Sequence, residues 1–176
     1  MGENNMKKVA MFEKVSYNEF LTACATQFSE GTMRSVNWKE YYDALKLPER
    51  KTKFSAGYDF HLPYDINIPA NGYVTIPLGI KCSIDEDYVL QLHIRSSYAT
   101  KKNLMLVNCT GIIDADYYNN PENEGHIMIK LKNNNPFSVI IKQGDCCCQG
   151  IFVQYGITID DNAKDTRVGG FGSTGK

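Results

Sequence analysis

The carboxylate best placed for chemistry in this sequence is Asp114, which follows the apolar run 111–113 in the segment GIIDADY. An aspartate held at the end of a strand can orient or deprotonate a water molecule. The Asp-x-Asp pattern of Asp114 and Asp116 is also typical of ordinary turns, because aspartate side chains accept hydrogen bonds from nearby backbone groups. Asp114 is therefore a candidate general base that needs partners from other segments.

Groups that suit an anionic ligand occur in two further places. One is RSS at 95–97, where a guanidinium stands beside two hydroxyls at the end of an expected strand. The other is the stretch GGFGSTGK after Arg167, where glycines let backbone N–H groups converge on an anion and Phe171 can stack on a base. Taken singly, RSS is more typical of a surface strand end, and the glycine-rich stretch is more typical of a solvated tail.

Composition sets the class of protein. The chain has 176 residues, 43% of them hydrophobic, which is enough for one domain with its own core. A net charge of −1 argues against stable nucleic-acid binding. Because no run approaches ~20 apolar residues and no signal peptide is evident, we expect a cytoplasmic protein that does not enter membranes. None of the six cysteines forms a CxxC pair, so we expect reduced thiols, the row 146–148 included.

The elements that must position these groups differ along the chain. A strand is expected over 7–12, then a helix opened by a capping box of Ser16 and Glu19. A second helix is expected to begin near Asn37 and to stop before Pro48. Short strands separated by turn signals follow, which is typical of a β-sandwich, barrel or jelly roll. The expected strands are 58–62, 73–80, 88–95, 104–108, 126–132, 137–142 and 147–155.

Taken together and in this order, several segments resemble the motifs of the trimeric dUTPases. They are AGYDF at 56–60, RSS at 95–97, N-x-x-GIIDADY at 108–117, GDCCCQGIF at 144–152 and R-x-GGFGSTG at 167–175. The resemblance implies a mainly β, jelly-roll or β-clip barrel, to which the sequence pattern adds a short helical N-terminal extension. It also implies a homotrimer in which the C-terminal tail closes a site shared between chains.

The change of pattern near residue 54 and the resemblance, which covers roughly residues 54–176, together divide the chain into three expected parts. Residues 1–53 form an N-terminal strand and helical extension packed on the core, and residues 54–166 form the dUTPase-like β domain. Residues 167–176 form a flexible glycine-rich tail that closes the active site.

The function implied is dUTP diphosphatase activity, with Asp114 as the base for a water that attacks the α-phosphorus. Such an enzyme yields dUMP and pyrophosphate, limits uracil in DNA and supplies dUMP for dTMP synthesis. Base and sugar contacts are expected from Asn108, Gly111, Tyr117, Ile127, Met128 and Phe171. Phosphate contacts are expected from Arg95, Ser96, Ser97, Gln149, Arg167, Gly172, Ser173 and Thr174. Mg²⁺ is the expected cofactor, held mainly by phosphates and waters, with Asp59 acting through a water.

Two departures from the family pattern bear on the site. The loop 118–125 is longer than the turn of many relatives, so the base-reading hairpin is expected to be longer or differently shaped. A single residue, Val168, separates Arg167 from Gly169 where many relatives have two. The N-terminal segment also exceeds the usual lead-in, so it either stabilises the fold or contacts a partner protein.

Two other functions stay open at this point. A dCTP deaminase has a similar subunit but needs a glutamate poised at the base, whereas Asp114 and the tail carrying Phe171 match the hydrolase pattern. A regulatory binding protein could use the same fold without needing Asp114, Arg167 and the STG tail together. Product analysis with dUTP and dCTP separates the first pair, and partner capture with and without residues 13–50 tests the third.

Overall fold

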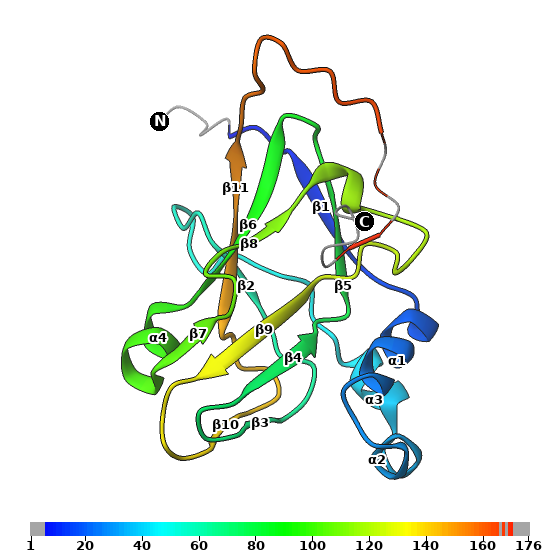
Figure 1. The fold of residues 1–176 in the computed structure, drawn as a ribbon, viewed down its shortest axis with the longest axis vertical. Helices are drawn as coiled ribbons and strands as arrows, with labels where there is room; N and C mark the ends of the chain where they lie inside the picture. The colour runs from blue at the N-terminus through cyan, green and yellow to red at the C-terminus, as the bar shows by residue number, and fades with distance from the viewer. Residues whose placement is uncertain (1–5, 166, 168, 171–176) are drawn as a thin grey trace.

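The computed structural model describes residues 6–165, 167, 169 and 170, and it is built mainly from antiparallel strands (Figure 1). The strands are β1 Ala10–Lys14, β2 Tyr58–Phe60, β3 Ile66–Ile68, β4 Tyr73–Pro77, β5 Ile80–Ile84, β6 Tyr88–Ile94, β7 Leu104–Leu106, β8 Gly111–Ile113, β9 Met128–Asn133, β10 Val139–Ile141 and β11 Cys148–Gln154. The helices are α1 Tyr17–Ala25, α2 Glu30–Ser35, α3 Trp38–Asp43 and α4 Ser96–Lys102, with a 3-10 turn, η1, at Ala115–Tyr117.

Two larger sheets form the body of the molecule. One has the strand order β2-β11-β6-β8 and the other β4-β9-β7, while β1-β5 and β3-β10 form separate two-stranded pairs. Every described pairing is antiparallel. Side chains alternate between the two faces of a strand, so β5 buries Ile80, Cys82 and Ile84. The expectation of a mainly β fold is confirmed.

One apolar core joins the sheets. Leu90 and Leu92 of β6, Leu131 of β9 and Ile141 of β10 are all fully buried in it. β11 pairs with β6 along its whole length, with Gly150 opposite Leu92. A methyl group at Gly150 would lie 2.7 Å from Leu90 Cδ1, so the packing around this pair leaves no room for a larger residue.

The N-terminal segment packs against this core. β1 pairs with β5 from Ala10 opposite Ile84 to Lys14 opposite Ile80. The Ser16 hydroxyl accepts a hydrogen bond from the Glu19 N–H, as the capping box predicts, and α1 buries Phe20 and Cys24. α3 begins at Trp38 after the N-cap Asn37, as expected, whereas α2 was not predicted. Figure 1 shows the three helices at the lower right, beside the arrowhead of β4 and the lower end of β5.

The predicted strand 73–80 is wrong, because the chain turns between β4 and β5 at Gly79. Gly79 has φ 73°, in the left-handed region that glycine adopts without strain. A methyl group there would lie 2.5 Å from Leu45 Cδ1. The turn sends β5 away from β9 and toward β1, which creates the place where the N-terminal segment attaches.

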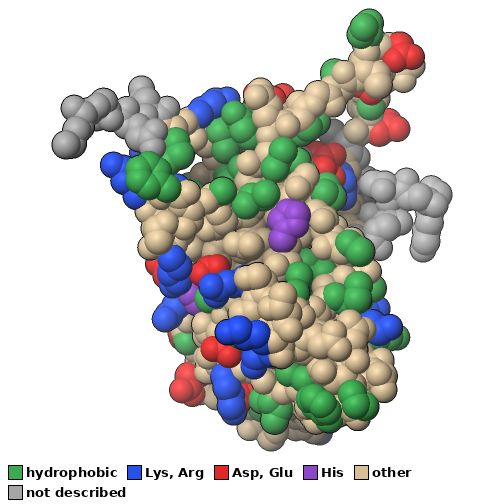
Figure 2. Space-filling model, turned by 90° about the vertical axis from the view of Figure 1, so that its left-hand side faces the viewer, with side chains coloured by type: hydrophobic (Ala, Val, Ile, Leu, Met, Phe, Trp, Pro, Cys, Tyr) green, Lys and Arg blue, Asp and Glu red, His purple; other side chains and the backbone are tan. Residues whose placement is uncertain are grey.

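After β11 the chain crosses the top of the molecule and descends near η1 (Figure 1). Figure 2 shows apolar side chains spread over the face at the left of Figure 1, with basic and acidic side chains mixed in its lower part. Within the described residues, no helix is long and apolar enough to cross a membrane.

Candidate functional site

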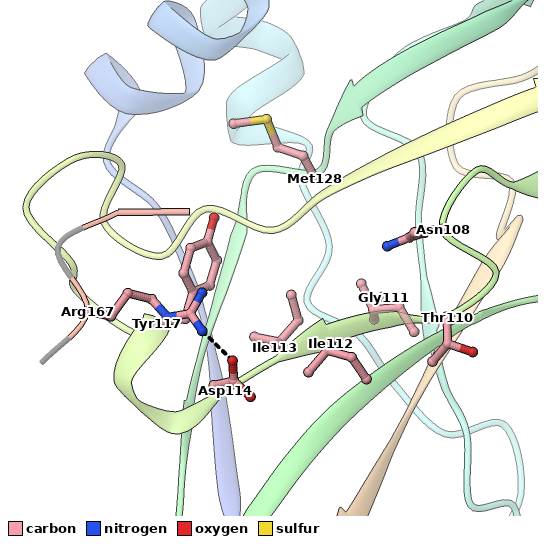
Figure 3. Close-up of a pocket in the computed structure, with 10 residues that line it drawn as sticks. Asn108, Thr110, Gly111, Ile112, Ile113, Asp114, Tyr117, Met128 and Arg167 are labelled. Atoms are coloured by element: carbon pink, nitrogen blue, oxygen red, sulfur yellow. Dashed lines mark hydrogen bonds and ion pairs between the residues drawn. The ribbon is translucent and has the colours of Figure 1, made fainter. Parts of the chain in front are cut away.

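A cavity of about 340 Å³ opens along β8, the η1 turn and the start of β9 (Figure 3). Asn108 lies at one end, while Asp114, Tyr117 and Arg167 lie together at the other. Its lining residues are Leu92, Asn108, Thr110, Gly111, Ile112, Ile113, Asp114, Tyr117, Met128 and Arg167. The cavity therefore combines a carboxylate, a guanidinium, an amide and an aromatic ring on an apolar floor.

Asp114 directly follows β8, a short strand at the edge of its sheet whose pairing with β6 holds the backbone up to this point. Its side chain is 41% exposed and forms an ion pair with the Arg167 guanidinium. Arg167 Nε also lies 3.1 Å from Asp116 Oδ1, and the Arg167 side chain is only 22% exposed. One cation is thus shared by two carboxylates at the mouth of the cavity.

Tyr117 forms a wall of the cavity and is 5% exposed. Its hydroxyl donates to the His126 carbonyl at 2.9 Å and accepts from Asn123 Nδ2 at 2.8 Å. Burial raises the pKa of Tyr117 against the smaller opposing effects of Asn123 and Arg167, so the phenol stays protonated and can donate. The Arg167 guanidinium lies 5.8 Å from the centre of the ring.

The expected base contacts lie at different depths. Asn108, Gly111 and Met128 line the cavity, and a methyl group at Gly111 would lie 3.1 Å from Leu92 Cβ. Ile127 does not line it: its side chain is fully buried, its N–H donates to the Ile80 carbonyl and its carbonyl accepts from Leu78. Of the two expected base contacts Ile127 and Met128, only Met128 therefore borders the cavity.

The remaining described phosphate candidates form a second cluster that does not line the cavity. Asp59 is 5% exposed, and Arg95 Nε lies 3.4 Å from its Oδ1. Gln149 of β11 stands opposite Asp59 of β2 in the strand register. Ser96 and Ser97 are exposed in the first turn of α4. Two groups of candidate residues thus occupy two places on one chain.

The tail candidates Phe171, Gly172, Ser173 and Thr174 lie outside the described residues. Gly170, just before them, donates its N–H to Glu122 Oε2 at 3.1 Å. A methyl group at Gly170 would lie 2.5 Å from Tyr117 Cε2. The start of the tail therefore passes directly against the aromatic wall.

Sequence reasoning did not single out Thr110, Ile112 and Ile113 as lining residues, nor Asp116 as a partner of Arg167. All four lie in the motif at 108–117, but nothing in its sequence distinguishes the residues that line the cavity from their neighbours. No group of three or more His, Cys, Asp or Glu side chains among the described residues could hold a metal ion.

The loop 118–125 bonds to Tyr117, a wall of the cavity, and has a hydrogen-bond network of its own. Asn120 is buried; its Nδ2 donates to the Tyr117 carbonyl at 2.9 Å and to Asn123 Oδ1 at 2.8 Å. Asn119, Glu124 and Gly125 have φ of 55°, 58° and 79°, in the left-handed region. The loop is an ordered turn built on asparagine side chains, as its length and composition permit.

Comparison with known proteins identifies relatives over most of this chain. The family model dUTPase matches residues 43–175. The deoxyuridine 5'-triphosphate nucleotidohydrolase of Lactococcus lactis is 39% identical over 133 residues, covering 74% of this chain and 89% of that protein. The protein of that name from Maricaulis maris is 32% identical over 147 residues, covering 77% of this chain and 91% of its own length.

Solved structures agree with the fold. The dUTPase of Streptococcus mutans is 35% identical with a TM-score of 0.64, covering 85% of this chain and 98% of that one. The dUTPase of phage phi11 of S. aureus, at 23% identity and a TM-score of 0.58, shares the fold over 68% of this chain and 90% of its own. The extent of these matches, together with the cavity around Asp114 and Tyr117, shows that the chain belongs to the dUTPase family.

Proposed function

We propose that this protein hydrolyses dUTP to dUMP and pyrophosphate, which limits uracil in DNA and supplies dUMP for dTMP synthesis. The observation that carries the proposal is the single cavity in which Asp114, Tyr117, Asn108 and Arg167 meet. The relatives at 39% and 32% identity carry the name of this activity and support it.

Recognition of the nucleoside is assigned to the cavity between Asn108 and Tyr117. The buried Tyr117 ring gives a flat wall for a deoxyribose. The two hydrogen bonds of its hydroxyl hold the ring in place, so it cannot move aside for an added 2′-hydroxyl. The Asn108 amide can both donate and accept, which suits the edge of uracil. Gly111 and Met128 complete the base pocket, Ile127 supports it from behind, and Phe171 is proposed to stack on the base from the tail.

The reaction is assigned to Asp114. Its partly exposed carboxylate can accept a proton from a water that attacks the α-phosphorus, after which pyrophosphate leaves. In this structure the Arg167 guanidinium occupies the Asp114 carboxylate as its ion-pair partner. A bound triphosphate offers Arg167 a stronger, bidentate partner, so substrate binding would free Asp114 as it recruits the guanidinium. Most of the remaining rate enhancement comes from positioning and charge stabilisation.

The phosphates are assigned to Arg95, Ser96, Ser97 and Gln149, with Gly172, Ser173 and Thr174 of the tail. The first four do not line the cavity of Asp114 in the same chain, so one nucleotide would need residues from two copies. This separation supports a homotrimer with shared sites. The buried free thiols support a reducing compartment, and we propose the cytoplasm.

Mg²⁺ is the proposed cofactor, and the donors present fit it. Asp59 is the carboxylate of the second cluster, but Arg95 lies 3.4 Å from it and its side chain is only 7% exposed. An indirect contact through a water suits that position, and Mg²⁺ keeps much of its water shell in proteins. A dUTPase of phage phi11 is described as coordinating a structural Mg(II) ion. The ion would offset the negative charge of the triphosphate.

The alternative with the same fold is a dCTP deaminase. That reaction needs a glutamate at the base, and no glutamate is among the described residues that line the cavity. The hydrolase is therefore favoured. A protein partner for the N-terminal segment stays a separate proposal, and α2, which buries none of its residues, is the surface it would use.

The test is pyrophosphate release from dUTP, dCTP, dTTP and UTP in the presence of Mg²⁺. We expect release from dUTP alone and a loss of about 10²–10⁴ in kcat for Asp114→Asn, the usual contribution of a general base. The matched control is Asp85→Asn, because Asp85 is a surface carboxylate paired with Lys7 at 3.3 Å. Ammonia from dCTP, or no turnover of dUTP, would refute the proposal.

A further inference from the structure

Three polar contacts join residues 13–19, here called the clasp, to residues 117–126. The Tyr118 hydroxyl donates to the Glu13 carboxylate, and the Ser16 N–H donates to Glu124 Oε2 at 3.0 Å. Glu19 Oε1 lies 3.0 Å from His126 Nδ1. The clasp precedes residue 43, where the family match begins. A segment outside the residues that the family model matches therefore contacts the loop that we expect from the sequence to be longer than the turn of many relatives.

The most buried of these contacts is the one between Glu19 and His126. The His126 side chain is fully buried and that of Glu19 is 13% exposed. The Gly79 N–H donates to His126 Nε2 at 2.8 Å, so Nε2 must be an acceptor. This assigns the ring proton to Nδ1, which donates to Glu19. Glu19 and Gly79 together fix both the tautomer and the orientation of the ring.

His126 links the Glu19 contact to the cavity through its backbone. Its backbone carbonyl accepts the hydrogen bond from the Tyr117 hydroxyl at 2.9 Å. Asn123, on the same loop, donates to that hydroxyl at 2.8 Å. A continuous chain of contacts therefore runs from α1 through a buried histidine to the aromatic wall of the nucleotide cavity.

The loop needs such support because of its backbone. Asn119 and Glu124 hold left-handed φ values that residues with a side chain rarely adopt. A methyl group at Gly125 would lie 2.5 Å from the Tyr117 carbonyl oxygen, which shows how tightly the loop folds back. Lys81 Nζ ties the same two residues from β5, at 2.7 Å from Asn119 Oδ1 and 3.4 Å from Glu124 Oε2.

We propose that the clasp positions the loop, and that Glu19 is a positioning residue that sets the affinity for the deoxyribose end of the substrate. The inference rests on the proposed function, because it takes Tyr117 as the sugar contact. Glu19 does not touch the substrate; it acts through His126. Its loss should weaken ground-state and transition-state binding equally, which raises KM and leaves kcat unchanged.

The experiment compares Glu19→Ala, Glu19→Gln and Glu30→Ala in steady-state hydrolysis of dUTP and UTP. Gln retains an oxygen that accepts from His126 Nδ1, so E19Q should match the unaltered protein. Glu30 is the matched control, because it lies in the same N-terminal segment and bonds Arg34 on the surface. E19A should raise KM for dUTP roughly 3- to 10-fold, the factor of one hydrogen bond, with kcat within about twofold. Its preference for dUTP over UTP should fall by a similar factor.

An unchanged KM in E19A, an E19Q variant as impaired as E19A, or an equal effect of E30A would overturn the proposal. If the unaltered protein hydrolyses no nucleotide, the proposed function fails, and hydrogen exchange of the Asn119, Glu124 and His126 amides decides on the clasp. Each of these amides donates within the loop, and exchange must be faster in E19A than in E30A. If E19A does not fold, Glu124→Ala replaces it: it must show the same increase in KM or exchange, and no increase overturns the proposal.

Discussion

Removing only the hydroxyl of Tyr117 should destabilise the protein well beyond the usual effect of a Tyr→Phe change. The hydroxyl makes two hydrogen bonds, a buried one of 2.9 Å to the His126 carbonyl and a partly buried one of 2.8 Å from Asn123 Nδ2. Each such bond contributes about 0.5–1.5 kcal/mol, and a buried carbonyl left without its partner costs about 1–3 kcal/mol. Because His126 is fully buried, we expect Tyr117→Phe to lower the free energy of unfolding by about 2–3 kcal/mol.

The assay is urea unfolding followed by far-ultraviolet circular dichroism, at one fixed protein concentration because an oligomer's stability depends on it. Tyr155→Phe is the control, since the Tyr155 hydroxyl also donates to a backbone carbonyl, that of Glu86 at 2.7 Å, but on an exposed residue. That change should cost less than about 0.5 kcal/mol. Equal losses in the two variants would refute the argument that burial makes the Tyr117 hydroxyl costly to remove.

Three further predictions follow from the same structure. Cys109 is the one exposed cysteine, and burial raises the pKa of the Cys24 and Cys82 thiols to about 12. A thiol reagent near neutral pH should therefore modify Cys109 first. Mass spectrometry that shows a second cysteine modified equally early would contradict this. Burial acts to raise the pKa of Glu124, but the Ser16 N–H and Lys81 lower it by more, so Glu124 stabilises the fold at about pH 7. The stability lost in Glu124→Gln should therefore shrink as the pH falls below 4.5, the ordinary value, and a difference that grows in acid would contradict the sign. Gly150→Ala should lower the free energy of unfolding in urea by about 1–3 kcal/mol, because the methyl group would lie 2.7 Å from Leu90 Cδ1. A loss below about 0.5 kcal/mol would show that the core side chains rearrange to make room for the methyl group.

Local signals in the sequence predicted the elements whose causes are local. The capping box of Ser16 and Glu19 begins α1 as expected, because both partners lie within one turn. α2 was missed because it buries none of its residues and so has no apolar periodicity. The turn at Gly79 was missed because its cause is distant: the residues that crowd it, Leu45 and Phe20, belong to the N-terminal segment.

The candidate site was predicted as a set of segments rather than as an arrangement. Motif order placed Asp114, Tyr117 and Asn108 in one function, and the chain places them in one cavity. The pairing of Arg167 with Asp114 and Asp116 depends on where the tail runs, which residue spacing does not fix. The contact of Glu19 with His126 could not be predicted for the same reason. The sequence indicates the capping position of Glu19, but His126 is distant from it along the chain.

The pairing of β1 with β5 has a consequence for solubility. β5 buries alternate side chains, and its backbone groups along one side are satisfied by Ala10–Lys14. A chain shortened to the family-matched residues 43–175 would lose that neighbour and present an open strand edge. Unpaired edges recruit strands from other molecules. We therefore expect the N-terminal strand to protect against edge-to-edge aggregation, and trimming the protein to residues 43–175 would remove it.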